Sequence, residues 1–121
     1  MTQEEKDLLL KDLCARLPYF TKVQIKNEIV VLDSICDDDG YHFNFIGDDR
    51  EGVNIEQVKP YLFPLSSMTE EQKSQYSFFL TRIIDGYDSS LLIDWLNKNH
   101  FDFRGLIPMG LANDATGKNI Y

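Results

Sequence analysis

Apolar residues recur along this chain with two different periods, one typical of helices and one typical of strands. Near the start they recur every three or four positions behind Thr2 and Glu5, a pair whose side chains reciprocally cap the first turn of a helix. Pro18 then disfavours helical backbone in the residue before it. The pattern predicts a helix from about residue 3 to residue 17. Its apolar face comprises Leu9, Leu10, Leu13, Cys14 and Leu17.

Between residues 22 and 46 the apolar period changes to two, as in strands with one buried face. Residues that favour turns divide this region at positions 27–28 and 39–40. The second division is an Asp-Gly pair, which is favoured in tight hairpins. The pattern therefore predicts an antiparallel meander of three strands, over residues 22–26, 29–36 and 41–46.

Pairing across these two turns gives a consistent set of buried positions. A turn at residues 27–28 places Ile25 opposite Val30, and a two-residue turn at 39–40 places Cys36 opposite Phe43. A four-residue second turn shifts the register by two, which leaves each side chain on the same face. Either arrangement predicts a core face made of Val23, Ile25, Val30, Leu32, Cys36, Tyr41, Phe43 and Phe45.

The segment that follows is less regular. Residues 47–52 form an acidic loop, and residues 53–55 are a candidate for a short fourth strand. Residues 59–65 contain Pro60 and Pro64, and proline is rare inside regular sheets because it cannot donate a ladder hydrogen bond. We therefore expect an extended crossing there, outside any regular element.

Two further helices are predicted in the second half of the chain. Thr69 and Gln72 form another capping pair, and the helix behind them carries an apolar stripe of Tyr76, Phe79, Leu80, Ile83 and Tyr87. Residues 88–90 end this helix and begin the next, whose inward side chains are Leu91, Leu92, Trp95 and Leu96. From Phe101 onward, glycine and proline predict an irregular tail.

These elements predict one α+β domain over residues 1–121, with the two C-terminal helices packed on the apolar face of the sheet. The chain is 43% hydrophobic, which is enough for a single core. No stretch approaches the roughly 20 apolar residues that cross a bilayer. The charged N-terminus has no apolar run of signal-peptide length. We expect a cytoplasmic protein with reduced thiols and no membrane partner.

The net charge of −8 is concentrated in one region. Residues 27–56 carry nine acidic side chains and a single basic one, Arg50. Direct binding of nucleic acid is disfavoured, because phosphate contacts need clustered Lys and Arg. The acidic segment is a candidate surface for a basic protein, including one that normally binds DNA; the alternative is a charged turn that only solubilises the chain. The candidate residues are Asp37, Asp38, Asp39, Asp48, Asp49 and Glu51.

The motifs that would indicate a hard cation or a phosphate are incomplete. An EF-hand loop with Gly40 at its sixth position would place Ile35 and Ile46 at the first and last ligand positions, and neither can bind calcium. Residues 112–119 differ from a phosphate-binding loop at Ala112 and Asn119, and no helix can follow them. We therefore expect no nucleotide cofactor and no calcium site.

Soft metal ligands are few and scattered. Cys14, Cys36, His42 and His100 show neither the C-x-x-C nor the H-x-x-x-H spacing of a zinc site. Both cysteines fall on predicted core faces, where free cysteine acts as a small apolar side chain. We expect no metal and no Cys–His nucleophile.

His100, Asp102 and Arg104 lie close together where the third helix gives way to the tail. A His–Asp hydrogen bond beside an arginine is one way to orient a general base. The alternative is that Asp102 and Arg104 pair with each other or with backbone groups to fix the path of the chain. The sequence leaves both interpretations open.

Three stretches of the chain resemble one family of small proteins. They are residues 11–18 (KDLCARLP), 58–71 (VKPYLFPLSSMTEE) and 94–112 (DWLNKNHFDFRGLIPMGLA). The family comprises uncharacterised proteins of gut Bacteroides-type bacteria, often encoded in prophage or other mobile-element regions. The resemblance implies a biological setting and transfers no activity or site residue.

The leading hypothesis is a non-enzymatic accessory protein of a mobile element that acts through protein–protein contact. It rests on the acidic segment and on the lack of an assembled catalytic motif. One alternative is a small enzyme or ligand-binding domain with its site at His100, Asp102 and Arg104. Another is a structural component of a phage particle, which stable self-assembly would favour.

Overall fold

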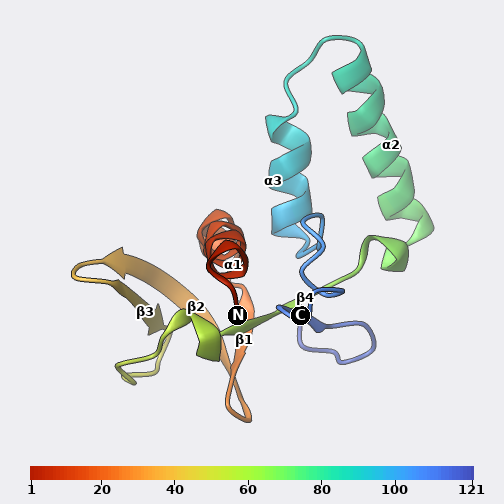
Figure 1. Cartoon of the computed structure of the whole chain (residues 1–121). Coiled ribbons are helices and arrows are strands. Elements are labelled where there is room, and N and C mark those ends of the chain that lie inside the picture. The colour runs from red at the N-terminus through yellow and green to blue at the C-terminus, as the bar shows by residue number, and fades with distance from the viewer.

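The computed structural model describes residues 1–121 as a sheet crossed by one helix, with a helical hairpin extending from it (Figure 1). The elements are α1 (Gln3–Ala15), β1 (Lys22–Ile25), β2 (Glu28–Asp37), β3 (Tyr41–Phe45), β4 (Lys59–Leu62), α2 (Glu70–Ile84), α3 (Ser90–Lys98) and β5 (Asn113–Asp114). The strands are arranged in the order β3-β2-β1-β4-β5, and only β4 and β5 are parallel. The predicted α+β layout is confirmed.

Helix α1 begins as predicted. The Glu5 N–H donates to Thr2 Oγ1 at 3.1 Å, and the Thr2 N–H donates to Glu5 Oε1 at 2.8 Å. The helix ends at Ala15, and a 3-10 turn follows over Leu17–Tyr19. The prediction that Cys14 belongs to the buried face is wrong. Cys14 is exposed, because the buried face of this helix is formed by other residues: Leu9, Asp12, Leu13 and the C-cap residue Arg16.

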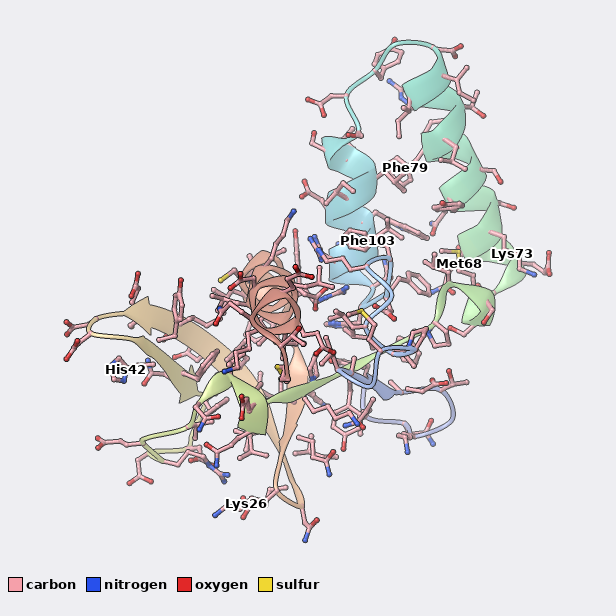
Figure 2. All side chains as sticks on the ribbon, viewed as in Figure 1. Lys26, His42, Met68, Lys73, Phe79 and Phe103 are labelled. Atoms are coloured by element: carbon pink, nitrogen blue, oxygen red, sulfur yellow. The ribbon has the colours of Figure 1, made fainter.

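The β1–β2 hairpin confirms the predicted faces but not the predicted register. Its turn lies at Lys26 and Asn27, one residue earlier than expected, so Val23 pairs with Val30 and Ile25 with Glu28. Lys26, which Figure 2 labels at this turn, has a φ of 57° and therefore a left-handed backbone. A shift of two residues keeps each side chain on its face, and Val23 and Ile25 remain in the core.

The β2–β3 pairing contradicts the predicted position of Cys36. Phe43 pairs with Ile35, and Cys36 is exposed on the other face. The register changes at Asp33, an additional residue between the Leu32–Phe45 and Ser34–Asn44 pairs. Such a bulge exchanges inward and outward positions in the rest of the strand. Its sequence signal is weak, since the β-branched run gives no sign of the extra residue.

Strand β4 occupies part of the segment for which we expected an extended crossing, so that prediction is wrong for residues 59–62. Pro60 pairs with Val23 of β1, while the ladder to β5 begins one residue later, at Tyr61. The candidate strand at residues 53–55 is also wrong. A 3-10 turn over Ile55–Gln57 replaces it and is joined to α1 by the Lys6–Glu56 ion pair at 3.0 Å.

The C-terminal tail packs on the sheet. It consists mostly of turns, as predicted, but contains β5, which runs parallel to β4. The Ala115 N–H donates to the Leu62 carbonyl at 2.8 Å, which extends this contact beyond β5. From Gly105 onward the tail contributes four buried apolar residues, Leu106, Leu111, Ala112 and Ala115.

Helices α2 and α3 follow the sheet as predicted, but they pack mainly against each other. Figure 2 shows Phe79 on the α2 side of this hairpin and Phe103 near its base, beside α1. The hairpin has its own small core of Met68, Leu92, Leu96 and Phe101, which meets the sheet through a β-bridge between Phe63 and Phe101. No helix is both long and apolar enough to span a bilayer.

The inward positions predicted for the hairpin are partly wrong. Leu80, Tyr87 and Leu91 are exposed, whereas Leu92 and Leu96 are buried. The reason is that two helices projecting from a sheet have only each other to pack against. The stripe of each helix that can be buried is therefore narrower than its apolar pattern.

A buried ion cluster joins α1 to the tail. Asp12 and Arg16 are both 0% exposed, and Arg16 donates to the Asp12 carboxylate through Nε at 2.9 Å and Nη2 at 3.0 Å. Arg104 Nη1 donates to the same carboxylate at 2.7 Å, and Arg16 Nη2 also donates to the Phe101 carbonyl at 2.6 Å. The Phe103 ring lies within 5.7 Å of the Arg16 guanidinium and 4.3 Å of that of Arg104. One carboxylate therefore holds two cations.

Replacing Asp12 tests how far the fold depends on this cluster. We expect Asp12→Asn to lower the free energy of unfolding by about 3–5 kcal/mol in a denaturant titration, because it leaves buried guanidinium groups without a counter-ion. Asp94→Asn is the control, since Asp94 is exposed and forms no ion pair. A loss below about 1 kcal/mol for Asp12→Asn would contradict a dependence on the cluster.

Candidate functional site

The first group of predicted acidic residues lies at the tip of the β2–β3 hairpin. Asp37 ends β2, and Asp38 and Asp39 form the turn with Gly40. Asp39 and Gly40 have φ values of 53° and 107°, the left-handed backbone that an Asp-Gly turn accommodates. All three aspartates are exposed, and His42 Nε2 lies 2.7 Å from the Asp38 carbonyl, which fixes the turn.

The second acidic group is brought back along the same edge strand. After β3 the chain reverses, and Asp48 forms an isolated bridge with Phe45. Residues 50–53 then line a shared cavity of about 350 Å³ with residues 42–44 of β3. Both acidic groups therefore lie along the β3 edge of the sheet, an arrangement that their separation in sequence does not reveal.

Arg50 neutralises only part of this charge. It donates to both oxygens of Asp48, at 2.9 Å and 2.8 Å, and to Glu28 at 2.5 Å. These hydrogen bonds lower the pKa of Asp48 and raise that of Arg50. The other five of the six candidate acidic residues are exposed and form no ion pair within the chain. We refer to these five residues as the acidic edge: Asp37, Asp38, Asp39, Asp49 and Glu51.

His100, Asp102 and Arg104 do not converge on a common point. The Asp102 carboxylate accepts the N–H groups of Leu106 and Ile107, each at 2.8 Å, which fixes the path of the tail. Arg104 instead reaches Asp12 in the buried ion cluster. His100 hydrogen-bonds to neither of the other two.

The His100 ring is held against the last residue of the sequence. It stacks on Tyr121 with 3.8 Å between ring centroids, and the Tyr121 hydroxyl donates to the Tyr61 carbonyl at 2.8 Å. Burial, assisted by the positive charges of Arg16 and Lys22, lowers the pKa of His100 to about 4. The imidazole is therefore neutral at physiological pH.

The potential metal ligands predicted from the sequence do not come together either. Cys14 lies on α1, Cys36 on β2 and His42 on β3, whereas His100 follows the C-cap residue of α3. No three His, Cys, Asp or Glu side chains are grouped so that they could hold a metal ion. Residues 112–119 include β5 and a turn, so they form no helix for a phosphate to bind.

The ion cluster was not predicted from the sequence, although the sequence contains a signal for it. Asp12 and Arg16 have the i,i+4 spacing of a helical ion pair and fall in phase with Leu9 and Leu13. Charged residues within an apolar stripe indicate a buried pair. The contribution of Arg104, 92 positions away from Asp12, has no comparable local signal.

Comparison with known proteins gives no further assignment. No protein-family model, curated protein or solved structure matches the chain. The function is therefore inferred from the charges and contacts of this chain's own residues.

The pKa of His100 predicts a specific pH dependence of stability. Because its pKa falls from 6.5 to about 4 on folding, its contribution is complete above pH 6.5 and is lost as the pH falls toward 4. Between pH 7 and pH 5 we expect a loss of about 2 kcal/mol in unfolding free energy that His100→Gln lacks. Denaturant titrations of both proteins across this range measure it. Parallel pH profiles would contradict the prediction.

Proposed function

We propose that this chain is a non-enzymatic interaction protein of a mobile genetic element, and that it binds a basic partner through the acidic edge. One observation carries the proposal: five exposed carboxylates without an internal counter-ion lie along a single edge of the sheet. Repulsion among such charges disfavours the compact state. A basic partner would relieve that repulsion.

The charge pattern also defines the kind of partner. A negative surface steers a Lys- and Arg-rich protein and repels the phosphate backbone. A nucleic-acid-binding protein is one such partner, and in that case the acidic edge would occupy its DNA-binding surface. His100, Asp102 and Arg104 each contact different groups within the chain and form no common site, which favours binding over catalysis.

The biological setting in this proposal comes from the resemblance of residues 11–18, 58–71 and 94–112 to the mobile-element family. We place the protein in the cytoplasm. Cys14 and Cys36 are both exposed and unpaired, and a reducing compartment keeps such thiols free.

A neutralised variant tests the acidic edge. We expect the immobilised chain to retain basic proteins from a bacterial lysate at low salt and to release them as ionic strength rises above about 0.15 M, where surface charges are screened. The variant Asp37→Asn, Asp38→Asn, Asp39→Asn, Asp49→Asn, Glu51→Gln should retain none of them. Displacement by duplex DNA would identify the partner as a nucleic-acid-binding protein.

The control removes the same charge from other exposed positions. It carries Glu4→Gln, Asp7→Asn, Glu71→Gln, Asp85→Asn and Asp94→Asn. We expect this variant to retain the same proteins as the unmodified chain. Equal loss in both variants would mean that net charge alone drives the association, and equal retention would mean that the acidic edge takes no part. Either result overturns the proposal.

A second candidate function, a component of a larger particle, is favoured by a different surface. The outer end of the α2–α3 hairpin exposes large apolar side chains, and Ile84 is 84% exposed. Exposed apolar groups in a cluster often mark an assembly surface. Besides Ile84, the residues are Phe78, Leu80, Tyr87 and Leu91.

Self-assembly through the hairpin would appear as a mass that increases with concentration. We expect light scattering over a roughly fiftyfold concentration range to show oligomers of the unmodified chain and monomers of Ile84→Glu. Ile46→Glu is the control, because Ile46 is an exposed apolar residue away from the hairpin. A monomer at all concentrations would exclude this second function.

A further inference from the structure

Strand β3 leaves one side of its backbone without a partner. It is the outermost strand of the sheet, and β2 is the only strand beside it (Figure 1). The Ile46 N–H donates to a β2 carbonyl at 2.9 Å, whereas the Phe45 carbonyl is turned the other way and accepts the Asp48 N–H at 3.4 Å. Backbone groups alternate in direction along a strand, so those of Tyr41 and Phe43 also point away from β2.

These two residues offer main-chain donors and acceptors at the edge of the sheet. No turn or loop of the chain forms a backbone hydrogen bond with Tyr41 or Phe43. Proteins usually protect such an edge with a lysine, a proline or a bulge in the edge strand, or by making that strand very short. None of these occurs in β3, and the bulge at Asp33 lies in β2. The opposite edge, β5, has only two residues. β3 is therefore the edge to which a further strand can be added.

The surface beside β3 has room for such a strand. The cavity of about 350 Å³ that residues 42–44 share with residues 50–53 lies along it. A smaller hollow of about 110 Å³ lies at the start of β3, where Leu10, Tyr41 and Ile55 supply its apolar wall. An added strand would direct alternate side chains to opposite faces of the sheet. Every second residue of that strand would therefore lie on the face with the apolar hollow.

The charges around β3 define what the added strand carries. Residues 37–39 lie at the start of β3, and Glu51 lines the cavity beside its middle. Arg50 also lines this cavity, but two carboxylates already bind its guanidinium. A second copy of this chain would bring its own acidic edge against these residues, and like charges placed opposite each other destabilise strand pairing. A segment rich in Lys or Arg would instead be attracted.

We propose that β3 is the docking site for an extended basic segment of a partner protein, which joins the five-stranded sheet as a sixth strand. This inference rests on the proposed function and specifies how the acidic edge recognises its partner. Main-chain hydrogen bonds to Tyr41 and Phe43 supply affinity, and the surrounding carboxylates select basic side chains. Aliphatic residues at alternate positions face the apolar hollow, which leaves the other positions for Lys or Arg.

Hydrogen exchange of the ¹⁵N-labelled full chain tests this mode of binding, with the terminally blocked peptide Lys-Val-Lys-Val-Lys-Val-Lys as the probe. We expect saturating peptide to slow amide exchange of Tyr41 and Phe43 at least about tenfold, because both N–H groups become hydrogen-bonded. The amides of His42 and Asn44 point toward β2 and should change less. A peptide that does not bind would overturn strand addition. Binding without protection of Tyr41 and Phe43 would also overturn it, but would leave the acidic edge as a binding surface.

Two N-methylated peptides separate main-chain recognition from charge. Both keep the side chains and the charge of the probe, but one is methylated on its three Val residues and the other on three of its Lys residues. A strand presents alternate N–H groups to its neighbour, so only one of the two peptides loses the donors that meet β3. We expect their affinities to differ at least about tenfold. Equal affinities would mean that charge alone attracts the peptide, and would overturn strand addition.

The neutralised variant of the acidic edge tests the selection of basic segments. We expect it to bind the unmethylated peptide at least about tenfold more weakly than the unmodified chain does. The control variant, with the same charge removed elsewhere, should keep its affinity. Unchanged affinity of the neutralised variant would overturn the selection by charge. The lysate experiment is separate, because it shows whether the acidic edge binds basic proteins by any mode.

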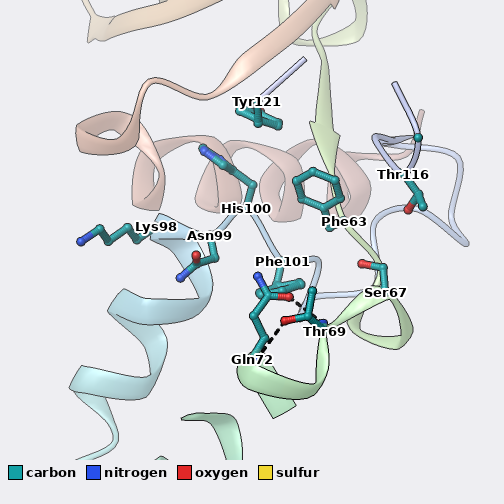
Figure 3. Close-up of a pocket in the computed structure, with 11 residues that line it drawn as sticks. Phe63, Ser67, Thr69, Gln72, Lys98, Asn99, His100, Phe101, Thr116 and Tyr121 are labelled. Atoms are coloured by element: carbon teal, nitrogen blue, oxygen red, sulfur yellow. Dashed lines mark hydrogen bonds between the residues drawn. The ribbon is translucent and has the colours of Figure 1, made fainter. Parts of the chain in front are cut away.

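A cavity away from β3 reports non-specific coating by the peptide. Figure 3 shows this cavity between His100 and Thr69, where Lys98 points away from the other lining residues. No residue of β3 or of the acidic edge lines it. Gly117 lines it within an exposed turn, and its N–H forms no hydrogen bond within the chain. We expect amide exchange of Gly117 to stay unchanged. Equal slowing at Gly117 and at Tyr41 would overturn the proposal.

Discussion

The structure depends on one buried carboxylate. Asp12 accepts hydrogen bonds from Arg16, the C-cap residue of its helix, and from Arg104 in the tail, and both Asp12 and Arg16 are removed from water. Ions so placed are stable only when their partners are held in position. The cluster therefore fixes α1 relative to residues 101–104, the segment that also carries the Phe63–Phe101 bridge between sheet and hairpin.

This arrangement accounts for the separation of charge over the molecule. Arg16 and Arg104 are used inside, and Arg50 is bound by Asp48 and Glu28, so none of these three arginines balances the acidic edge. The acidic edge therefore keeps its negative charge, and the proposed binding of a basic protein rests on that charge.

The features that the sequence predicted correctly are local. Capping at Thr2 and Thr69 depends on residues three positions apart, and the Asp39-Gly40 turn on neighbouring residues. The faces of β1 and the first part of β2 follow from strand periodicity. That prediction failed beyond Asp33, because a bulge exchanges faces without changing the apolar run. The six predicted acidic residues were identified from charge density alone, but their position along one edge was not.

Local patterns were sufficient to predict the α+β class, the three helices, the meander and the location of the negative charge, since each depends on short-range periodicity or composition. Three features were not predictable in this way: Pro60 lies in a strand between β1 and β5, Arg104 reaches Asp12, and Tyr121 stacks on His100. Except for the last, these contacts join residues far apart in the chain. All of them arise from the packing of several elements at once, which no local pattern encodes.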